Sequence, residues 1–168
     1  FGFHHVPTGE HRIVGVVLCN PFGYDAMCTY RTYRHLAEGL AQAGFHVLRF
    51  DYHGTGDSPG VDDEPHRIKG MLRDIHAAVE ELKRRTGVTE VSLFGVRFGA
   101  LLAGHAASER EDISSLILFG SVLTGRSYAR ELRAFHLLKN SGGADLQVAG
   151  YRVRSDLQEE LKSIDLLR

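Results

Sequence analysis

Gly95-Val96-Arg97-Phe98-Gly99-Ala100 places an arginine between two glycines, at the point where an apolar run gives way to a helical pattern. The run is Glu90–Val96, and the pattern that follows it contains Leu101, Leu102 and His105. Glycine has no side chain and adopts unusual backbone angles, so the two glycines let a strand and a helix approach each other closely. We therefore predict a buried strand that turns directly into a helix around Arg97.

The rest of the chain repeats this alternation of apolar runs and helical patterns. Three further runs show little alternation, as is typical of strands buried on both faces: Ile13–Cys19, His46–Tyr52 and Ser115–Val122. Helical spacing at residues 30–40 and 68–82 stops at Gly44 and Gly87, because glycine commonly ends helices. The alternation predicts an α/β protein with a parallel sheet and helices on both of its faces. Phe1–Pro7 is expected to be an edge strand.

Beyond Val122 the pattern changes to amphipathic helices. One covers residues 127–139, a loop follows at Asn140–Gly143, and helical spacing returns with Leu157, Leu161, Ile164 and Leu167. We expect an incomplete core over residues 1–125 and the start of a helical cap or insertion over residues 126–168. Because the chain begins at Phe1 and stops at Arg168 within such patterns, we expect a fragment truncated at both ends.

The 168 residues carry 20 Lys and Arg against 21 Asp and Glu, with 43% hydrophobic residues, which is typical of a soluble globular domain. A net charge of −1 gives no electrostatic reason to expect nucleic acid or an anionic membrane as partner. No apolar run is long enough to span a bilayer. Cys19 and Cys28 are too few for a disulfide framework, so we expect free thiols and a cytoplasmic protein.

The turns after the first three runs resemble those of the α/β-hydrolase superfamily, in its serine-aminopeptidase-like and lipase-like branch. The nucleophile elbow of that family is G-x-S-x-G, matched here by Gly95 and Gly99 with Arg97 in place of the serine. Asn20-Pro21 stands where His-Gly is common, and the D-x-x-G-x-G-x-S loop is matched by Asp51, Gly54, Gly56 and Ser58. The resemblance implies an α/β-hydrolase fold, here the N-terminal part of a doubly wound, mostly parallel sheet.

A closer likeness is to the hydrolase-like proteins associated with bacterial exosortase systems. Those proteins commonly carry G-x-R-x-G-A, here Gly95–Ala100, and a later V-x-x-G-x-x-Y-x-x-E-L, here Val122–Leu132. The likeness implies that Arg97 is a feature of the subfamily. The fold implies the strand order second, first, third, fourth, with a crevice between Phe22 and Phe98 at the carboxyl ends of the strands.

Arg97 cannot act as a nucleophile, because a guanidinium offers five donors and no acceptor. The resemblance implies that the backbone N–H groups of Phe98 and Phe22 are oxyanion donors. We expect Arg97 to bind a carboxylate or phosphate of a small-molecule substrate, with other substrate-side residues at Asn20, Gly23 and Tyr24. The alternative is an internal ion pair between Arg97 and an acid such as Asp51 or Asp57.

No other residue stands out as a replacement nucleophile. Cys28 is expected to be a small buried side chain, and Ser58 is expected to cap or tighten its turn. Ser121 ends the fourth run, and no acid is spaced to orient His53. The sequence has no H-E-x-x-H and no paired C-x-x-C, so no metal is expected. Acidic residues follow Gly54–Gly56 where a phosphate-binding helix would begin, so no nucleotide cofactor is expected.

Two functional hypotheses follow. The first is a hydrolase-like protein that acts on an ester, thioester or amide bond, with its substrate's anionic group held by Arg97. The second is a non-catalytic ligand-binding or scaffold protein of the same fold. The acid and histidine of the family's triad follow the nucleophile in chain order, and neither can be assigned in this sequence. The sequence does not indicate an oligomeric state.

Overall fold

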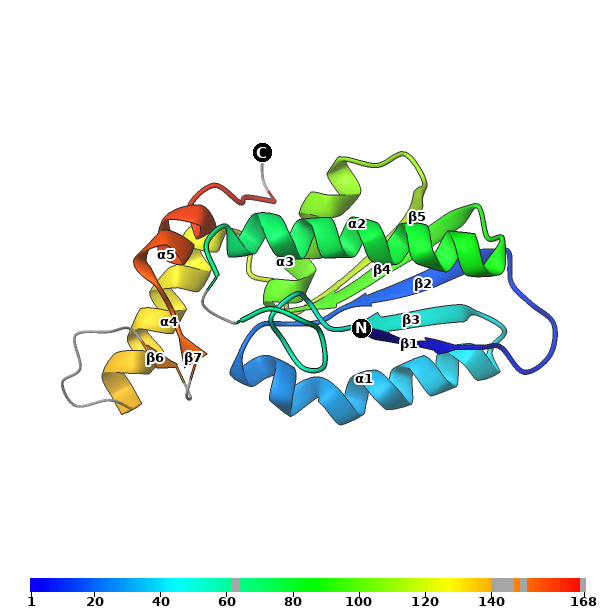
Figure 1. Cartoon of the computed structure of the whole chain (residues 1–168), viewed down its shortest axis with the longest axis horizontal. Helices are drawn as coiled ribbons and strands as arrows, with labels where there is room; N and C mark the ends of the chain where they lie inside the picture. Colours follow the sequence, from blue (N-terminus) through cyan, green and yellow to red (C-terminus); the bar gives the residue numbers. More distant parts are fainter. Residues whose placement is uncertain (62–63, 140–146, 149–150, 167–168) are drawn as a thin grey trace.

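A computed structural model describes residues 1–61, 64–139, 147–148 and 151–166 (Figure 1). Its centre is a five-stranded sheet in the order β1-β3-β2-β4-β5. The strands are β1 (Gly2–His5), β2 (Val14–Cys19), β3 (His46–Phe50), β4 (Glu90–Val96) and β5 (Ile113–Phe119). All neighbouring pairs are parallel except β1 with β3. The strand order predicted from the sequence and the edge strand near Phe1 are confirmed.

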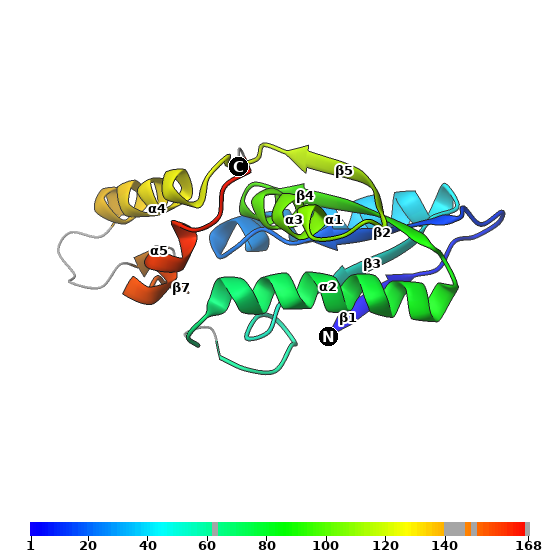
Figure 2. The same ribbon diagram turned by 90° about the horizontal axis from the view of Figure 1, so that it is seen from above.

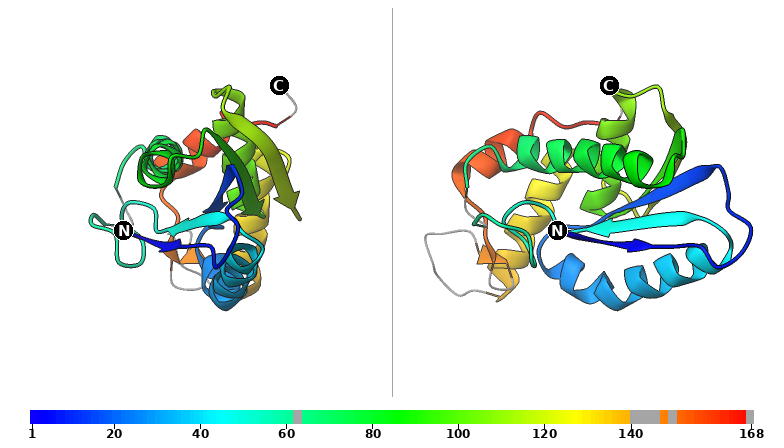
Figure 3. Two further views of the ribbon diagram at one scale, coloured as in Figure 1. Left: turned by 90° about the vertical axis from the view of Figure 1, so that its right-hand side faces the viewer. Right: turned by 45° about the vertical axis from the view of Figure 1, so that its right-hand side comes forward.

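Helices cover both faces of the sheet, as the alternation predicted. They are α1 (Tyr24–Gln42), α2 (Arg67–Thr86) and α3 (Phe98–Ser108). Successive residues of a strand point to opposite faces. Val16 and Leu18 of β2 accordingly pack with α1, whereas Val17 and Cys19 join the cluster that α2 and α3 cover. The end-on view shows α1 and α2 on opposite sides of the sheet (Figure 3).

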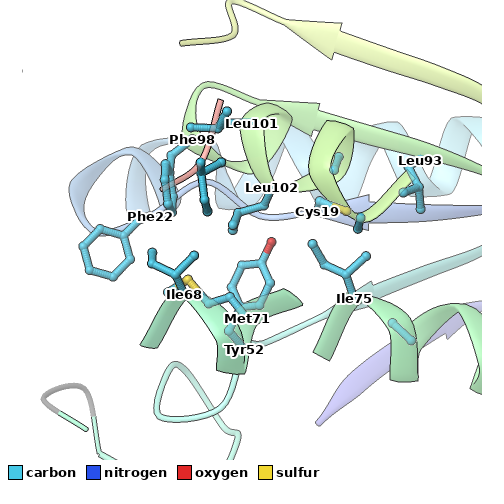
Figure 4. Close-up of a cluster of buried hydrophobic side chains, with 14 of the residues drawn as sticks. Cys19, Phe22, Tyr52, Ile68, Met71, Ile75, Leu93, Phe98, Leu101 and Leu102 are labelled. Atoms are coloured by element: carbon cyan, nitrogen blue, oxygen red, sulfur yellow. The ribbon is translucent and has the colours of Figure 1, made fainter. Parts of the chain in front are cut away.

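The larger of the two hydrophobic clusters lies between the sheet, α2 and α3. Ile68, Met71 and Ile75 of α2 face Leu101 and Leu102 of α3 across this layer (Figure 4). These five side chains are nearly or completely buried. Burial of apolar area of this kind is the main stabilising contribution to the fold, and it holds α3 firmly against the end of β4.

One prediction about the strands is wrong. The fourth apolar run was expected to be buried on both faces, but β5 is exposed along most of its length, and Phe119 is 68% exposed. The reason is topological, because among the described residues β5 lies at the edge of the sheet and pairs only with β4. Apolar composition alone does not distinguish a central strand from such an edge strand.

The last part of the described chain packs beyond the carboxyl ends of the strands (Figure 2). It comprises α4 (Gly125–Lys139), the short hairpin β6 (Gln147–Val148) and β7 (Tyr151–Arg152), and α5 (Ser155–Leu161). The hairpin was not predicted, and α5 ends at Leu161 although the pattern extended to Leu167. Leu167 and the expected loop at Asn140–Gly143 lie outside the described residues.

This C-terminal segment shares the larger hydrophobic cluster with α2 and α3. Its buried members include Tyr128, Leu132, Leu157 and Leu161. The backbone N–H of Ile68 at the start of α2 donates a hydrogen bond of 3.0 Å to Glu160 Oε2 of α5. The segment is therefore packed on the core through both apolar and polar contacts, and the domain division at residue 125 stays a prediction.

Three imidazoles gather at the edge of the sheet formed by β1 and β3. His4 Nε2 lies 3.1 Å from His46 Nδ1, and the ring of His11 meets that of His46 edge to face at 5.0 Å. Burial lowers the pKa of His4 and of His46, and neighbouring cationic groups lower both further. Only one proton fits between His4 Nε2 and His46 Nδ1, because they lie at hydrogen-bond distance. This contact is satisfied when both imidazole rings are neutral.

We expect the free energy of unfolding to decrease as the pH falls below about 6.5. A histidine with a depressed pKa in the folded state takes up its proton more readily when the chain unfolds, so acid favours unfolding. Urea unfolding followed by circular dichroism at about pH 7.5 and pH 5.5 measures this difference. His46→Gln should reduce the difference. His35→Gln on the exposed side of α1 is the matched control and should leave it unchanged.

Candidate functional site

Arg97 sits at the junction of β4 and α3 with φ 55° and ψ −119°. Among the described residues, Arg97 and His66 are the non-glycine residues with positive φ. Such a conformation is strained for a residue with a side chain, and it persists where the surrounding structure enforces it. The backbone N–H of Arg97 is tied to the carbonyl of Phe119 at 3.0 Å. The predicted strand-to-helix turn around Arg97 is therefore confirmed.

The glycines on either side of Arg97 are required by close backbone contacts. A Cβ atom on Gly95 would lie 2.6 Å from the backbone of Ala100. A Cβ atom on Gly99 would lie 2.5 Å from the carbonyl oxygen of Asn20 in the first turn. Both distances are far below normal van der Waals contact, so the turn presses directly on the chain that follows β2.

A cavity of about 100 Å³ opens beside Arg97, between the start of α1 and α4. One end is charged, with Arg97, Asp25 and Glu131. The remainder of the lining is aromatic or aliphatic apart from Gly23: Phe22, Tyr24, Tyr128, Leu132, Phe135, Val148 and Val153. Of the residues expected on the substrate side, Gly23 and Tyr24 line this cavity together with Arg97. Asn20 does not.

The guanidinium of Arg97 forms ion pairs with two carboxylates. Its Nη2 donates to Glu131 of α4, and its Nε lies 3.5 Å from Asp25 of α1. Partial burial opposes the charged form, but the hydrogen bond to Glu131 and the nearby carboxylates outweigh it and raise the pKa of Arg97. The expected alternative of an internal ion pair is therefore present, but its partners are not Asp51 or Asp57.

Phe98 and the aromatic rings around it form the floor of the site. Phe98 is 1% exposed, stacks on Tyr128 with 4.6 Å between ring centroids, and meets Phe22 edge to face at 6.2 Å. The predicted crevice between Phe22 and Phe98 is thus wrong in detail, because these two rings pack against each other. The opening lies instead on the side of α4.

The first turn is held by its own hydrogen bonds. The side-chain amide of Asn20 donates to the carbonyl of Phe50 at 2.6 Å, and the Tyr52 hydroxyl donates to the carbonyl of Asn20 at 3.2 Å. Asn20 thereby ties the end of β2 to the end of β3. Gly23, with φ 61°, then starts α1. A larger cleft of about 720 Å³, which Asn20 lines, separates this turn from the second one.

The second turn is likewise internally bonded. The Asp51 carboxylate accepts the backbone N–H of Asp57 at 3.1 Å, and the Ser58 hydroxyl donates to the Asp51 carbonyl at 2.6 Å. Gly54 and Gly56 both have positive φ, of 69° and 51°. These hydrogen bonds and backbone angles hold the second turn in its shape.

Arg67 of α2, which the sequence did not indicate as a site residue, holds the second turn in place. It is 6% exposed and donates hydrogen bonds to the carbonyls of Val61 and Gly54 at 2.9 and 3.3 Å. Its guanidinium also lies 6.0 Å from the ring centroid of Phe22. Nothing in the sequence distinguishes this arginine from those on exposed helix faces, because its partners are backbone carbonyls of the loop that precedes α2.

The other candidate residues lie away from the cavity beside Arg97. Cys28 is exposed, which corrects the expected burial, and it does not line the cavity. Both cysteines are free thiols, as predicted. Ser121 donates to the Val122 carbonyl at 3.0 Å. His53 does have an acid beside it, since its Nε2 lies 2.9 Å from Glu64 Oε2, and spacing did not reveal this.

Among the described residues, the structure shows neither a metal-binding cluster nor a membrane-spanning helix. No three histidine, cysteine, aspartate or glutamate side chains in this part of the chain are placed to hold a metal ion. No helix within it is long and apolar enough to cross a membrane.

Comparison with known proteins gives a consistent likeness. The family model for serine aminopeptidase S33 matches residues 16–166. Human protein ABHD12B is 39% identical over 77 residues, 46% of this chain and 20% of that protein. Rat lysophosphatidylserine lipase ABHD12 is 32% identical over 88 residues, 51% of this chain and 21% of that protein. The matched stretch thus spans about a fifth of the length of these relatives.

Solved structures show the same arrangement of elements. Est1E from Butyrivibrio proteoclasticus superposes with a TM-score of 0.70 at 21% identity, covering 99% of this chain and 68% of that one. A carboxyl esterase from Bacillus coagulans gives a TM-score of 0.61 at 23% identity, covering 83% and 44%. At these identities the likeness shows the fold.

Proposed function

The chain belongs to the serine aminopeptidase S33 family, and from this membership we propose that it is a hydrolase-like protein acting on an ester, thioester or amide bond. Its α/β-hydrolase fold follows from the mixed sheet, the family match and the solved structures that resemble it. The name of the lysophosphatidylserine lipase relative supports an ester as the bond attacked. We place the protein in the cytoplasm and residues 126–168 in a cap over the site.

The observation that carries the proposal is the conformation of Arg97 at the β4–α3 junction. We propose that Arg97 takes the position of the elbow serine, as in the hydrolase-like proteins of exosortase systems. Phe98 is the first residue of α3, and the first N–H groups of a helix have no acceptor within the helix. The N–H groups of Phe98 and Phe22 would stabilise the negative charge that develops on a carbonyl oxygen.

Arg97 would contribute its positive charge and would not form a covalent bond to the substrate. A guanidinium has no lone pair to attack a carbonyl, so the attacking oxygen has to come from water or from a residue elsewhere. Arg97 would hold an anionic group of the substrate through two parallel hydrogen bonds. This requires the substrate to replace Glu131, whose carboxylate occupies the guanidinium in the structure.

A second candidate function is favoured by the lining of the cavity. Its described residues include no serine, threonine, cysteine or histidine, and the hydroxyl groups there belong to Tyr24 and Tyr128. Serine, threonine and cysteine are the side chains that commonly act as nucleophiles, and histidine is the commonest general base. The alternative is therefore a non-catalytic protein that binds a small anionic ligand through Arg97.

Hydrolysis of p-nitrophenyl butyrate, a butyryl thioester and a p-nitroanilide by the 168-residue chain tests the proposal. We expect turnover above the buffer rate for at least one substrate. For a version of that substrate that also carries a carboxylate, we expect Arg97→Gln to lose about tenfold or more of the rate, because the guanidinium no longer holds the anionic group. A fluorophosphonate probe should not label the chain covalently, because position 97 has no hydroxyl.

Glu159→Gln is the matched control, since Glu159 is exposed on α5 and pairs with Lys162 away from the cavity. It should hydrolyse the substrate at the wild-type rate. If none of the three substrates is hydrolysed, the hydrolase proposal fails and the binding alternative stands.

A further inference from the structure

The cavity beside Arg97, its charged end included, is small, and three of its apolar lining side chains are buried. Leu132 and Val148 are each 8% exposed, and Val153 is 2% exposed. The volume is about 100 Å³, whereas an apolar cavity of about 150 Å³ holds a benzene molecule. The space therefore suits an aliphatic group of a few carbons and excludes a long acyl chain.

The charged end of the same cavity already holds a carboxylate. Glu131 of α4 reaches the guanidinium of Arg97, and this contact shows that a carboxylate fits there sterically and electrostatically. Arg97 and Glu131 side chains are 39% and 46% exposed, so both can be reached from solvent. If Glu131 turns away, its charge moves into water and no buried charge is left without a partner.

We propose that this cavity binds short-chain carboxylates, with the alkyl group against Leu132, Val148 and Val153 and the carboxylate on Arg97 in place of Glu131. The inference rests on the proposed function and deepens it, because it names the anionic group that Arg97 would hold as the carboxylate of a short-chain compound. Binding itself requires no turnover. Glu131 then acts as an internal competitor that closes the site when no ligand is present.

Titration with acetate, butyrate, hexanoate and octanoate, followed by NMR of the Arg97 side-chain N–H signals, tests the proposal. Each buried methylene should increase affinity about fourfold. We expect affinity to rise from acetate to butyrate and to stop rising by octanoate, because the cavity is then full. Absence of binding by all four, or a steady rise through octanoate, would overturn the proposal.

Two variants test separately where the carboxylate and the alkyl group of the ligand bind. Glu131→Gln removes the competitor's charge, and affinity for butyrate should increase about twofold to fivefold. Glu159→Gln makes the same charge change outside the cavity and should have no effect. Leu132→Ala enlarges the apolar end, so the rise in affinity should extend to longer chains. Weaker binding in Glu131→Gln, or an unchanged length limit in Leu132→Ala, contradicts the assignment.

Arg97→Gln should weaken butyrate binding about tenfold or more, since a hydrogen-bonded charge pair is lost. If that variant does not fold, the Glu131 and Leu132 variants decide the matter. Failure of this inference and failure of the proposed function are distinguishable. Butyrate binding without ester, thioester or amide turnover contradicts only the hydrolysis, and turnover without butyrate binding contradicts only the carboxylate site.

Discussion

Gly99→Ala should destabilise the protein by about 3 kcal/mol or more, because the added Cβ would overlap backbone atoms that cannot move aside. The Cβ would lie 2.5 Å from the carbonyl oxygen of Asn20 and closer still to that of Cys19. Relief requires α3 to withdraw from the end of β2, which also displaces Arg97. Urea unfolding followed by circular dichroism measures the change, since the chain has no Trp for fluorescence.

Gly39→Ala is the matched control for this substitution. Gly39 lies in α1, is exposed, and has nothing within 4 Å of an added Cβ. Alanine is favoured over glycine within a helix, so this variant should be more stable by about 0.5–1 kcal/mol. Equal stability of Gly99→Ala and wild type would mean that the first turn and the turn around Arg97 are not in contact.

Phe98→Ala should reduce the free energy of unfolding by about 3–5 kcal/mol. The ring of Phe98 is almost completely buried and contacts both Phe22 in the first turn and Tyr128 in α4. Its removal leaves a cavity under the site and loosens α4, which carries Glu131. Limited proteolysis within α4 should therefore become faster, together with the loss of stability in urea.

Phe119→Ala removes the same side chain from a nearby exposed position. Phe119 is 68% exposed at the end of β5, and substitutions at such positions change stability by no more than about 0.5 kcal/mol. A similar loss in both variants would indicate that Phe98 contributes little through packing. That result would contradict the description of Phe98 as the floor of the site.

The sequence predicted the parts of the fold that depend on local sterics and on hydrophobic patterning. The turn around Arg97 was predictable because Gly95 and Gly99 allow close contacts that other residues would prevent. The stop of α2 at Gly87 was predictable for a similar reason, since that glycine has φ 77°. The strand order came from the resemblance of the turns to a known superfamily and not from periodicity.

Side-chain partners were less predictable because they depend on tertiary packing. Asp25 and Glu131 are 72 and 34 positions from Arg97 in the sequence, and no spacing rule connects them. The acids first considered, Asp51 and Asp57, lie in a loop that satisfies its own hydrogen bonds. Arg67 was missed because a buried arginine bonded to carbonyl groups has the same sequence pattern as an exposed one.

A crystal structure of the chain grown with butyrate tests directly whether Arg97 binds the ligand. We expect the butyrate carboxylate at hydrogen-bond distance from the Arg97 guanidinium, its alkyl group against Leu132, and Glu131 turned toward solvent. Arg97 still paired with Glu131, and a cavity without butyrate, would contradict it.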